Sequence, residues 1–153
     1  MTVVVRSSTY RVPPARLFAF HQDVANLGRI SPPVPRFTPI SAPSPTRAGD
    51  LQEFTLGLGP LKVRWAARVT RFDEGRLLED VQERGPFRQW RHQHRVSPAA
   101  EGSRLTDVVV FRALPTRAGA FAEWLLLAPG IHAMFAWRHW KTRQLLDGLA
   151  REE

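Results

Sequence analysis

Five polar residues occupy alternating positions in three neighbouring segments of the sequence, and their side chains are of types that do chemistry. His92 and His94 are two residues apart, as are Asp80 and Gln82, and Asp107 follows in a third segment. In a β-strand, residues two apart point to the same face, so each pair would present its side chains together. An imidazole beside a carboxylate can transfer a proton near neutral pH.

Three interpretations of these residues remain open. They can form a buried hydrogen-bond network that only fixes the sheet, since buried polar groups need partners. They can bind the polar atom of an otherwise apolar ligand. They can also act as general acid and base, with His92, His94, Asp80 and Asp107 as the catalytic candidates. We favour ligand binding over catalysis.

A metal site is a fourth use of the same residues. His92 and His94 with Asp80 or Asp107 make a two-histidine, one-carboxylate set of the kind that transition metals use. The His-x-His pattern is short and common, and the chain contains no cysteine. We therefore expect no metal and no cofactor. The sequence also lacks a G-x-S-x-G nucleophile motif, a phosphate-binding loop and a dinucleotide fingerprint.

Periodicity and turn residues indicate the elements that position these side chains. Residues Thr2–Val12 favour a strand, and Pro14 can begin a helix that is followed by a second one at Asn26–Ile30. An edge strand is expected inside the proline-rich segment 32–45, because edge strands tolerate proline. Five more strands separated by glycine and proline turns are predicted at Asp50–Leu58, Leu61–Phe72, Leu77–Arg84, Arg88–Val96 and Arg104–Leu114.

The C-terminal part of the chain changes to a helical period. Gly119–Leu127 predicts a short apolar helix, and Pro129 begins a longer one, with a kink expected near Pro129-Gly130. The order predicts an α+β fold, a seven-stranded antiparallel sheet wrapped around the long C-terminal helix, with two short helices after strand 1. No other element is long enough to cover the apolar face of the sheet. We expect residues 1–153 to form a single domain.

Charged residues indicate which face of each strand meets solvent. Outward charges are expected at Lys62, Arg64, Arg68, Glu79, Glu83, Arg91, Arg95, Arg104 and Arg112. The inward residues and one face of the last helix give the expected ligand-binding set: Trp65, Asp80, Gln82, Trp90, His92, His94, Asp107, Phe111, Met134, Phe135 and Arg138. Arg138 lies on an apolar face, so we expect it to pair with Asp80 or Asp107 or to extend to solvent.

Several motifs connect this pattern to a known family. The central one is Asp80-x-Gln82-x-x-Gly85-Pro86-Phe87-x-x-Trp90-x-His92-x-His94, followed by Leu105-Thr106-Asp107. Supporting motifs are Pro13-Pro14 to Phe18, Asn26-Leu27, Ile30-x-Pro32-Pro33 and Met134-Phe135-x-x-Arg138. Together they resemble the START/birch-pollen-allergen (SRPBCC) superfamily, and within it the bacterial cyclase/dehydrase-like ligand-binding subgroup.

The resemblance implies a helix-grip fold with a cavity between the sheet and the last helix. Relatives hold sterols, lipids, polyketides, hormones or quinones in this cavity, which implies a small, mainly apolar ligand here. One alternative is a cofactor-free polyketide cyclase or dehydrase that uses a histidine and an aspartate of the cavity. The other is a lipid or quinone carrier that docks on membranes through the basic face of the sheet.

The net charge of +8 raises the question of an anionic partner. A nucleic-acid site needs an uninterrupted basic surface with exposed aromatic side chains. Here Glu79 and Glu83 interrupt the basic face, and the aromatic residues are expected inside. We expect no nucleic-acid partner and allow weak contact with an anionic membrane, to which the apolar run Trp124–Leu127 would add.

The start of the chain and its longest apolar stretch indicate the cellular compartment. Its start lacks the features of a signal peptide, and the apolar stretch Ala120–Trp137 is interrupted by charged and helix-breaking residues. We therefore expect a cytoplasmic protein.

The prolines of the edge strand argue against assembly through that edge, and the sequence gives no oligomeric state.

Overall fold

The computed structural model describes residues 1–113, 116, 119, 121 and 123–149 of the chain. Seven strands form one antiparallel sheet in the order β1-β7-β6-β5-β4-β3-β2. The strands are β1 (Thr2–Tyr10), β2 (Arg36–Ser41), β3 (Leu51–Leu58), β4 (Leu61–Asp73), β5 (Leu77–Arg84), β6 (Gln89–Ala99) and β7 (Gly102–Arg112). The helical elements are α1 (Pro14–Gln22), α2 (Val24–Ile30), the π-helical turn η1 (Glu123–Leu127) and α4 (Ala128–Leu149).

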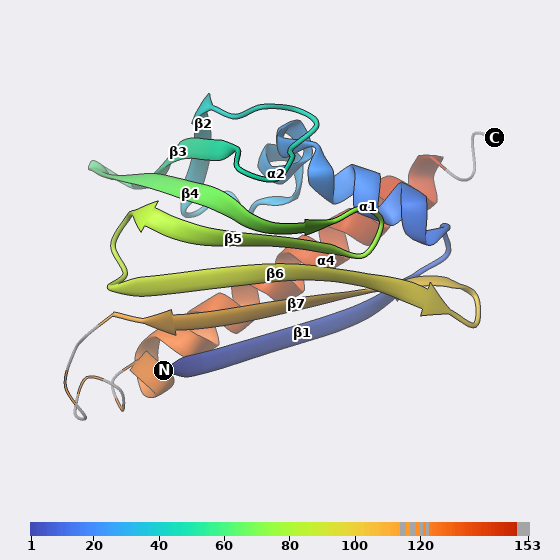
Figure 1. The fold of residues 1–153 in the computed structure, drawn as a ribbon. Coiled ribbons are helices and arrows are strands. Elements are labelled where there is room, and N and C mark those ends of the chain that lie inside the picture. Colours follow the sequence, from blue (N-terminus) through green and yellow to red (C-terminus); the bar gives the residue numbers. More distant parts are fainter. Residues whose placement is uncertain (114–115, 117–118, 120, 122, 150–153) are drawn as a thin grey trace.

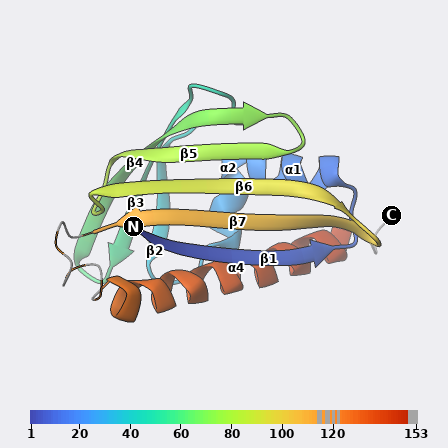
Figure 2. The same ribbon diagram turned by 60° about the horizontal axis from the view of Figure 1, so that its bottom comes forward.

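The sheet curves around α4, which runs along its concave side next to β1 (Figure 1, Figure 2). Helix α1 packs on β6 and β7, and α2 contacts both α4 and β2. The predicted helix-grip fold is therefore confirmed, including the two short helices after the first strand and the proline-bearing edge strand. Within the described residues, no helix is long and apolar enough to cross a membrane.

The two short helices follow from residues at their ends. Pro14 occupies the first turn of α1, where its missing N–H is not needed, and the Pro13 carbonyl accepts from Leu17 N at 3.2 Å. Asp23 ends α1 and begins α2, because its carboxylate accepts a hydrogen bond from Ala25 N at 3.0 Å. The chain therefore leaves helical geometry at Asp23, and α1 packs on β6 and β7 while α2 packs on α4 and β2.

Two apolar clusters fill the space between the sheet and the helices, and a polar layer lies between them. Along β7, Leu105 belongs to the first cluster and Val109 to the second, with Asp107 between the two. His92 of β6 and His139 of α4 meet Asp107 in this layer. The clusters stabilise the fold by apolar burial. The polar layer does not, because burying polar groups is costly unless they are hydrogen-bonded.

The structure corrects one outward-face prediction and confirms another. Glu79 does point to the convex face, but only 4% of it is exposed, because Thr70 and Gln93 cover its carboxylate and donate hydrogen bonds to it. Glu83 is exposed as expected and forms a cross-strand ion pair, since Arg68 donates to its carboxylate through Nη2 at 3.1 Å. The convex face therefore carries paired charges as well as free ones.

The approach to α4 also differs from the sequence prediction. The predicted Gly119–Leu127 helix falls partly on residues 120 and 122, which lie outside the described residues. Over Glu123–Leu127 the chain forms a π-helical turn instead, and α4 already begins at Ala128, so Pro129 and Gly130 lie in its first turn. The Glu123 carboxylate accepts a hydrogen bond from Ala113 N at 2.7 Å, which ties this turn to the end of β7.

Candidate functional site

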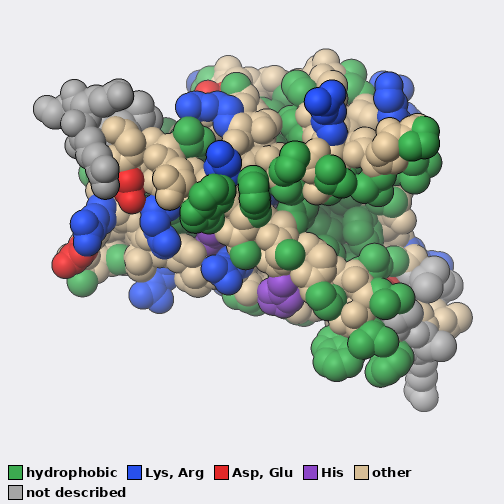
Figure 3. Space-filling model, turned by 180° about the vertical axis from the view of Figure 1, so that it is seen from behind, with side chains coloured by type: hydrophobic (Ala, Val, Ile, Leu, Met, Phe, Trp, Pro, Cys, Tyr) green, Lys and Arg blue, Asp and Glu red, His purple; other side chains and the backbone are tan. Residues whose placement is uncertain are grey.

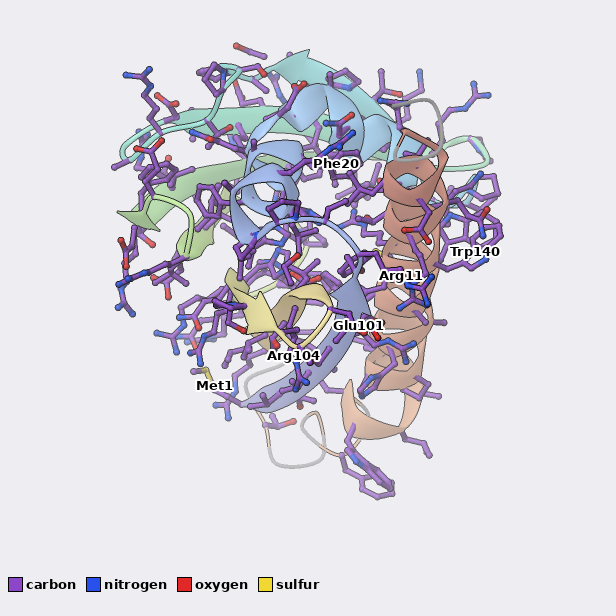
Figure 4. The ribbon with its side chains drawn as sticks, turned by 90° about the vertical axis from the view of Figure 1, so that its right-hand side faces the viewer. Met1, Arg11, Phe20, Glu101, Arg104 and Trp140 are labelled. Carbon is purple, nitrogen blue, oxygen red and sulfur yellow. The ribbon has the colours of Figure 1, made fainter. Side chains whose placement is uncertain are left out.

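A cavity of about 730 Å³ lies between the inner face of the sheet and the helices. Cavities that hold small molecules are typically about 300–1,000 Å³. Seen from behind, hydrophobic side chains surround a hollow on the helix side of the molecule (Figure 3). Phe20 of α1 points into the interior and lines this cavity, whereas Trp140 points from α4 away from it (Figure 4).

Aromatic rings form much of the cavity wall on the sheet side. The Trp65 ring stacks on Phe54 at 5.7 Å and meets the Trp90 ring edge-to-face at 5.1 Å. Phe87, in the loop between β5 and β6, lies 4.8 Å from Trp90. Offset and edge-to-face pairs are the arrangements that aromatic rings prefer, so this aromatic wall is well packed before any ligand binds.

The polar layer opens into the same cavity and is centred on Asp107. His92 Nε2 donates to Asp107 Oδ1 at 3.0 Å, and His139 Nε2 donates to Oδ2 at 2.6 Å. His94 Nδ1 also lies 2.6 Å from Oδ1, and His92 Nδ1 lies 3.5 Å from Asp80 Oδ2. One buried carboxylate thus meets three imidazoles, one of which also reaches a second carboxylate.

Burial and mutual charge move the pKa values of these groups in opposite directions. Burial alone would lower the pKa of His92, but its hydrogen bonds to Asp107 and Asp80 outweigh this and raise it to about 9. Burial and the neighbouring His92 lower the pKa of His94. Burial would raise the pKa of Asp107, yet the surrounding imidazoles hold it well below its usual range. At neutral pH the cavity therefore holds an imidazolium at His92 beside a neutral imidazole at His94.

Most of the residues predicted from the sequence line the cavity. They are Trp65, Asp80, Trp90, His92, His94, Asp107, Met134, Phe135 and Arg138. Gln82 and Phe111 are not among the lining residues. The Gln82 amide instead donates to the Phe87 carbonyl at 2.6 Å, and Phe111 is fully buried behind Phe87, with the two rings 5.5 Å apart. Both support the wall from behind.

Two histidines of the site were missed by the sequence reasoning. His139 binds Asp107 from α4, and His21 of α1 lies against His94 with the rings 5.1 Å apart. Burial lowers the pKa of His21 to about 3, so it stays neutral. The available signal was helical spacing, since His139 follows Phe135 by one turn and His21 follows Leu17 by one turn.

Arg138 enters the cavity from α4 without the predicted aspartate contact. Its Nη2 donates to Ser31 Oγ over 3.4 Å, and its guanidinium lies 5.4 Å from the centre of the Phe135 ring. Burial lowers the pKa of Arg138 to about 10, while the charges of Asp107 and Asp80 act in the opposite direction. The guanidinium is therefore still charged at neutral pH and is influenced by the aspartates from a distance.

The same cluster contains the donor set of a metal site. One ligand atom each from Asp80, His92 and His94 lies within 4.8 Å of the others. Both nitrogens of His92 already face carboxylates, however, and its raised pKa means that a metal ion would have to displace a proton. The side chains are of types that bind metals, but the two carboxylates around His92 favour a bound proton. We therefore still expect no metal at this site.

A curved antiparallel sheet that grips one long helix around an apolar cavity with a polar layer defines a class of protein, the helix-grip proteins. The chain belongs to the family described as polyketide cyclase/dehydrase and lipid transport, which matches residues 11–135. This family is of the SRPBCC type that the sequence motifs indicated. Family and fold support ligand binding in general, and they show no particular ligand.

Solved structures with the same fold come from several sources. Protein NE0264 from Nitrosomonas europaea has a TM-score of 0.74 at 11% identity, covering 97% of this chain and 96% of its own. Protein Ms6760 from Mycobacterium smegmatis has a TM-score of 0.72 at 18% identity, covering 96% and 92%. Ara h 8.0201 has a TM-score of 0.60 at 17% identity, covering 92% and 97%. At these identities the likeness shows the fold alone, and no curated protein matches the sequence.

Proposed function

We propose that this protein binds one small, mainly apolar molecule in the internal cavity, with a polar atom of that molecule held by the polar side chains that line the cavity. The observation that carries the proposal is the cavity of about 730 Å³, which combines an aromatic wall with a few convergent polar side chains. Ligand sites commonly have this composition, because apolar contact supplies affinity and a few polar groups fix orientation. The partner is then a lipid, polyketide, quinone or similar molecule.

Filling the cavity tests this proposal. Ala133 of α4 and Ala19 of α1 are both exposed helix residues, but only Ala133 lines the cavity. The wild type should bind the fluorescent apolar dye 1-anilinonaphthalene-8-sulfonate at one site. Ala133→Trp should abolish this binding, and Ala19→Trp should leave it intact. Dye binding that survives Ala133→Trp, or no binding by the wild type, would count against the proposal. Native mass spectrometry of protein from a bacterial host independently shows whether a ligand co-purifies.

A second candidate function is acid–base catalysis of the cyclase or dehydrase type. The observation that favours it is the pair of imidazoles whose pKa values are pushed apart, since His92 holds a proton and His94 does not. Enzymes use such pairs as acid and base in one site. Pentane-2,4-dione in D2O is a suitable probe, because NMR reports exchange of its acidic protons. Exchange accelerated by the wild type and lost in His94→Gln would support catalysis, and exchange at the buffer rate would refute it.

A third candidate is a carrier that collects its ligand from a membrane, and the turn before α4 favours it. Trp124, Leu125 and Leu126 are 63%, 52% and 70% exposed. Leu126 also lines the cavity, so the exposed apolar surface is continuous with its wall. The basic residues of the sheet lie on the convex face instead, so we assign docking to η1. Vesicles containing anionic phosphatidylglycerol should co-sediment with the wild type and not with Trp124→Glu, and failure of the wild type to co-sediment would exclude docking.

A further inference from the structure

Arg138 is a cation of the cavity wall that lacks an ionic partner. Among the described residues, its buried Nε has no hydrogen-bond partner, and its one side-chain hydrogen bond is the 3.4 Å contact with Ser31 Oγ. Over the described part of the chain, no carboxylate forms an ion pair with it. A guanidinium carries five N–H donors and is costly to bury without an anion. The structure therefore leaves the guanidinium in the cavity without an anion in direct contact with it.

The aspartates of the cavity are already engaged by other groups. Asp107 accepts hydrogen bonds from His92 and His139, and Asp80 faces the second nitrogen of His92. His92, an imidazolium at neutral pH, offsets one of their two negative charges, and the other acts on Arg138 only from a distance. Neither aspartate contacts Arg138. An anion that pairs directly with the guanidinium therefore has to come from outside the chain.

A neighbouring donor on α4 is also without a partner. Trp137 lines the cavity, and its buried indole Nε1 makes no hydrogen bond within the part of the chain that the structure describes. Two consecutive residues of one helix thus carry unsatisfied donors, and buried donors without acceptors are rare in folded proteins. The aromatic wall, by contrast, offers no charge and suits an apolar body.

We propose that the cavity binds a monoanionic amphiphile, a carboxylic acid whose carboxylate is held by Arg138 and whose apolar body packs on the aromatic wall. This proposal rests on the proposed function of the cavity and names the class of its ligand. A neutral molecule such as a hydrocarbon or a simple alcohol would leave the guanidinium unpaired. A dianion such as a phosphate monoester would place its second charge in the field of Asp80 and Asp107.

A matched pair of ligands and a matched pair of variants test the proposal. Dodecanoate and dodecan-1-ol share one apolar body and differ in charge, and 2-naphthoate and 2-naphthol repeat the comparison with an aromatic body. Arg138→Met keeps an unbranched apolar stem and removes the guanidinium with its charge. Arg143→Met is the control, because Arg143 is exposed on the same helix. Affinities of the full chain are measured by isothermal titration calorimetry at pH 7.5.

In at least one pair, the wild type should prefer the acid by roughly 10- to 100-fold, the range expected for a hydrogen bond to a charged group. Arg138→Met should lose this preference and retain affinity for the alcohol, while Arg143→Met should behave as the wild type. Equal affinity for acid and alcohol, or an acid preference that survives Arg138→Met, would overturn the proposal while leaving the proposed function intact. Failure of every probe to bind, the fluorescent dye included, would overturn the proposed function itself.

A measurement on the free protein adds a second criterion. If the guanidinium is unpaired in the empty cavity, Arg138→Met should melt no lower than the wild type, because the variant removes a buried charge that no carboxylate contacts. A melting temperature several degrees lower would show that Arg138 has a structural partner and would contradict the inference.

Discussion

Replacing His92 by glutamine should remove a distinctive dependence of stability on pH. The pKa of His92 is about 9 in the folded protein and about 6.5 in an unfolded chain. Between these values the folded state holds one more proton than the unfolded state, so the free energy of unfolding falls as pH rises. The contribution of His92 is complete below pH 6.5 and is lost as pH rises through about 9.

The size of this effect follows from the shift. One proton of difference gives a slope of about −1.4 kcal/mol per pH unit, which accumulates to about 3 kcal/mol over the interval. His21 and His94 act below this window, since their pKa values are lowered in the folded state and their contribution is lost as pH falls. Stability should therefore peak near pH 6.5, with separate groups responsible for each side.

Urea unfolding followed by tryptophan fluorescence between pH 6.5 and 10 measures this slope. The advantage of the wild type over His92→Gln should shrink by about 3 kcal/mol across that range. His132→Gln, an exposed histidine on the same helix as His139, is the control and should follow the wild type. If His92→Gln retains the wild-type slope, the extra proton does not reside on His92 and the assignment of an imidazolium to the cavity is wrong.

Three further substitutions test the packing that surrounds the cavity. Gly102→Ala should destabilise the fold by roughly 1–3 kcal/mol or more, as measured by urea unfolding. Gly102 has φ +118°, and an added Cβ would collide with the Tyr10 carbonyl. Gly130→Ala should instead be neutral or stabilise by up to about 1 kcal/mol, since an added Cβ has open space within α4, and a lower Tm would contradict this. Phe135→Ala should cost about 3–5 kcal/mol, because Phe135 is 1% exposed and packs its ring 4.9 Å from His92; a loss below 1 kcal/mol would show that the second apolar cluster closes around the gap.

The inner face of the sheet could be predicted because strand periodicity is simple. Arg91 and Arg95 fixed the outer face of β6, and the structure accordingly buries Trp90 and His92 on the inner face. The same logic was incomplete for Glu79, because burial on an outer face depends on the neighbouring strands. Gln93 comes from β6 and covers the carboxylate, which no pattern within β5 could reveal.

Gln82 shows where alternation alone is insufficient. The pairing of β5 with β6 ends at Val81 opposite Arg91, so Gln82 lies beyond this ladder. Its amide turns to the connecting loop and binds Phe87, and Gly85 leaves the room that the Gln82 side chain occupies. Which side chain bonds a loop depends on where the strand pairing stops, and strand ends are the least predictable part of a sequence pattern.

The histidines from the helices were missed for a different reason. Helical spacing places His139 on the inner face of α4, but only the folded arrangement brings that face to Asp107 of β7. Its contact joins residues that are 32 positions apart, and nothing local in the sequence specifies it. The type and faces of the elements could thus be predicted, whereas the meeting of three elements at one carboxylate required the structure.

The order of the strands has a consequence for synthesis. β1 is made first but pairs with β7, so that Thr2 lies opposite Phe111. At roughly 5–20 residues per second, β1 waits on the order of 5–20 s for its partner to be translated. Helix α4, which covers the inner face, is made after all of the strands. The apolar interior that later encloses a ligand is therefore open on the ribosome for this interval, and the nascent chain is prone to aggregation until α4 is released.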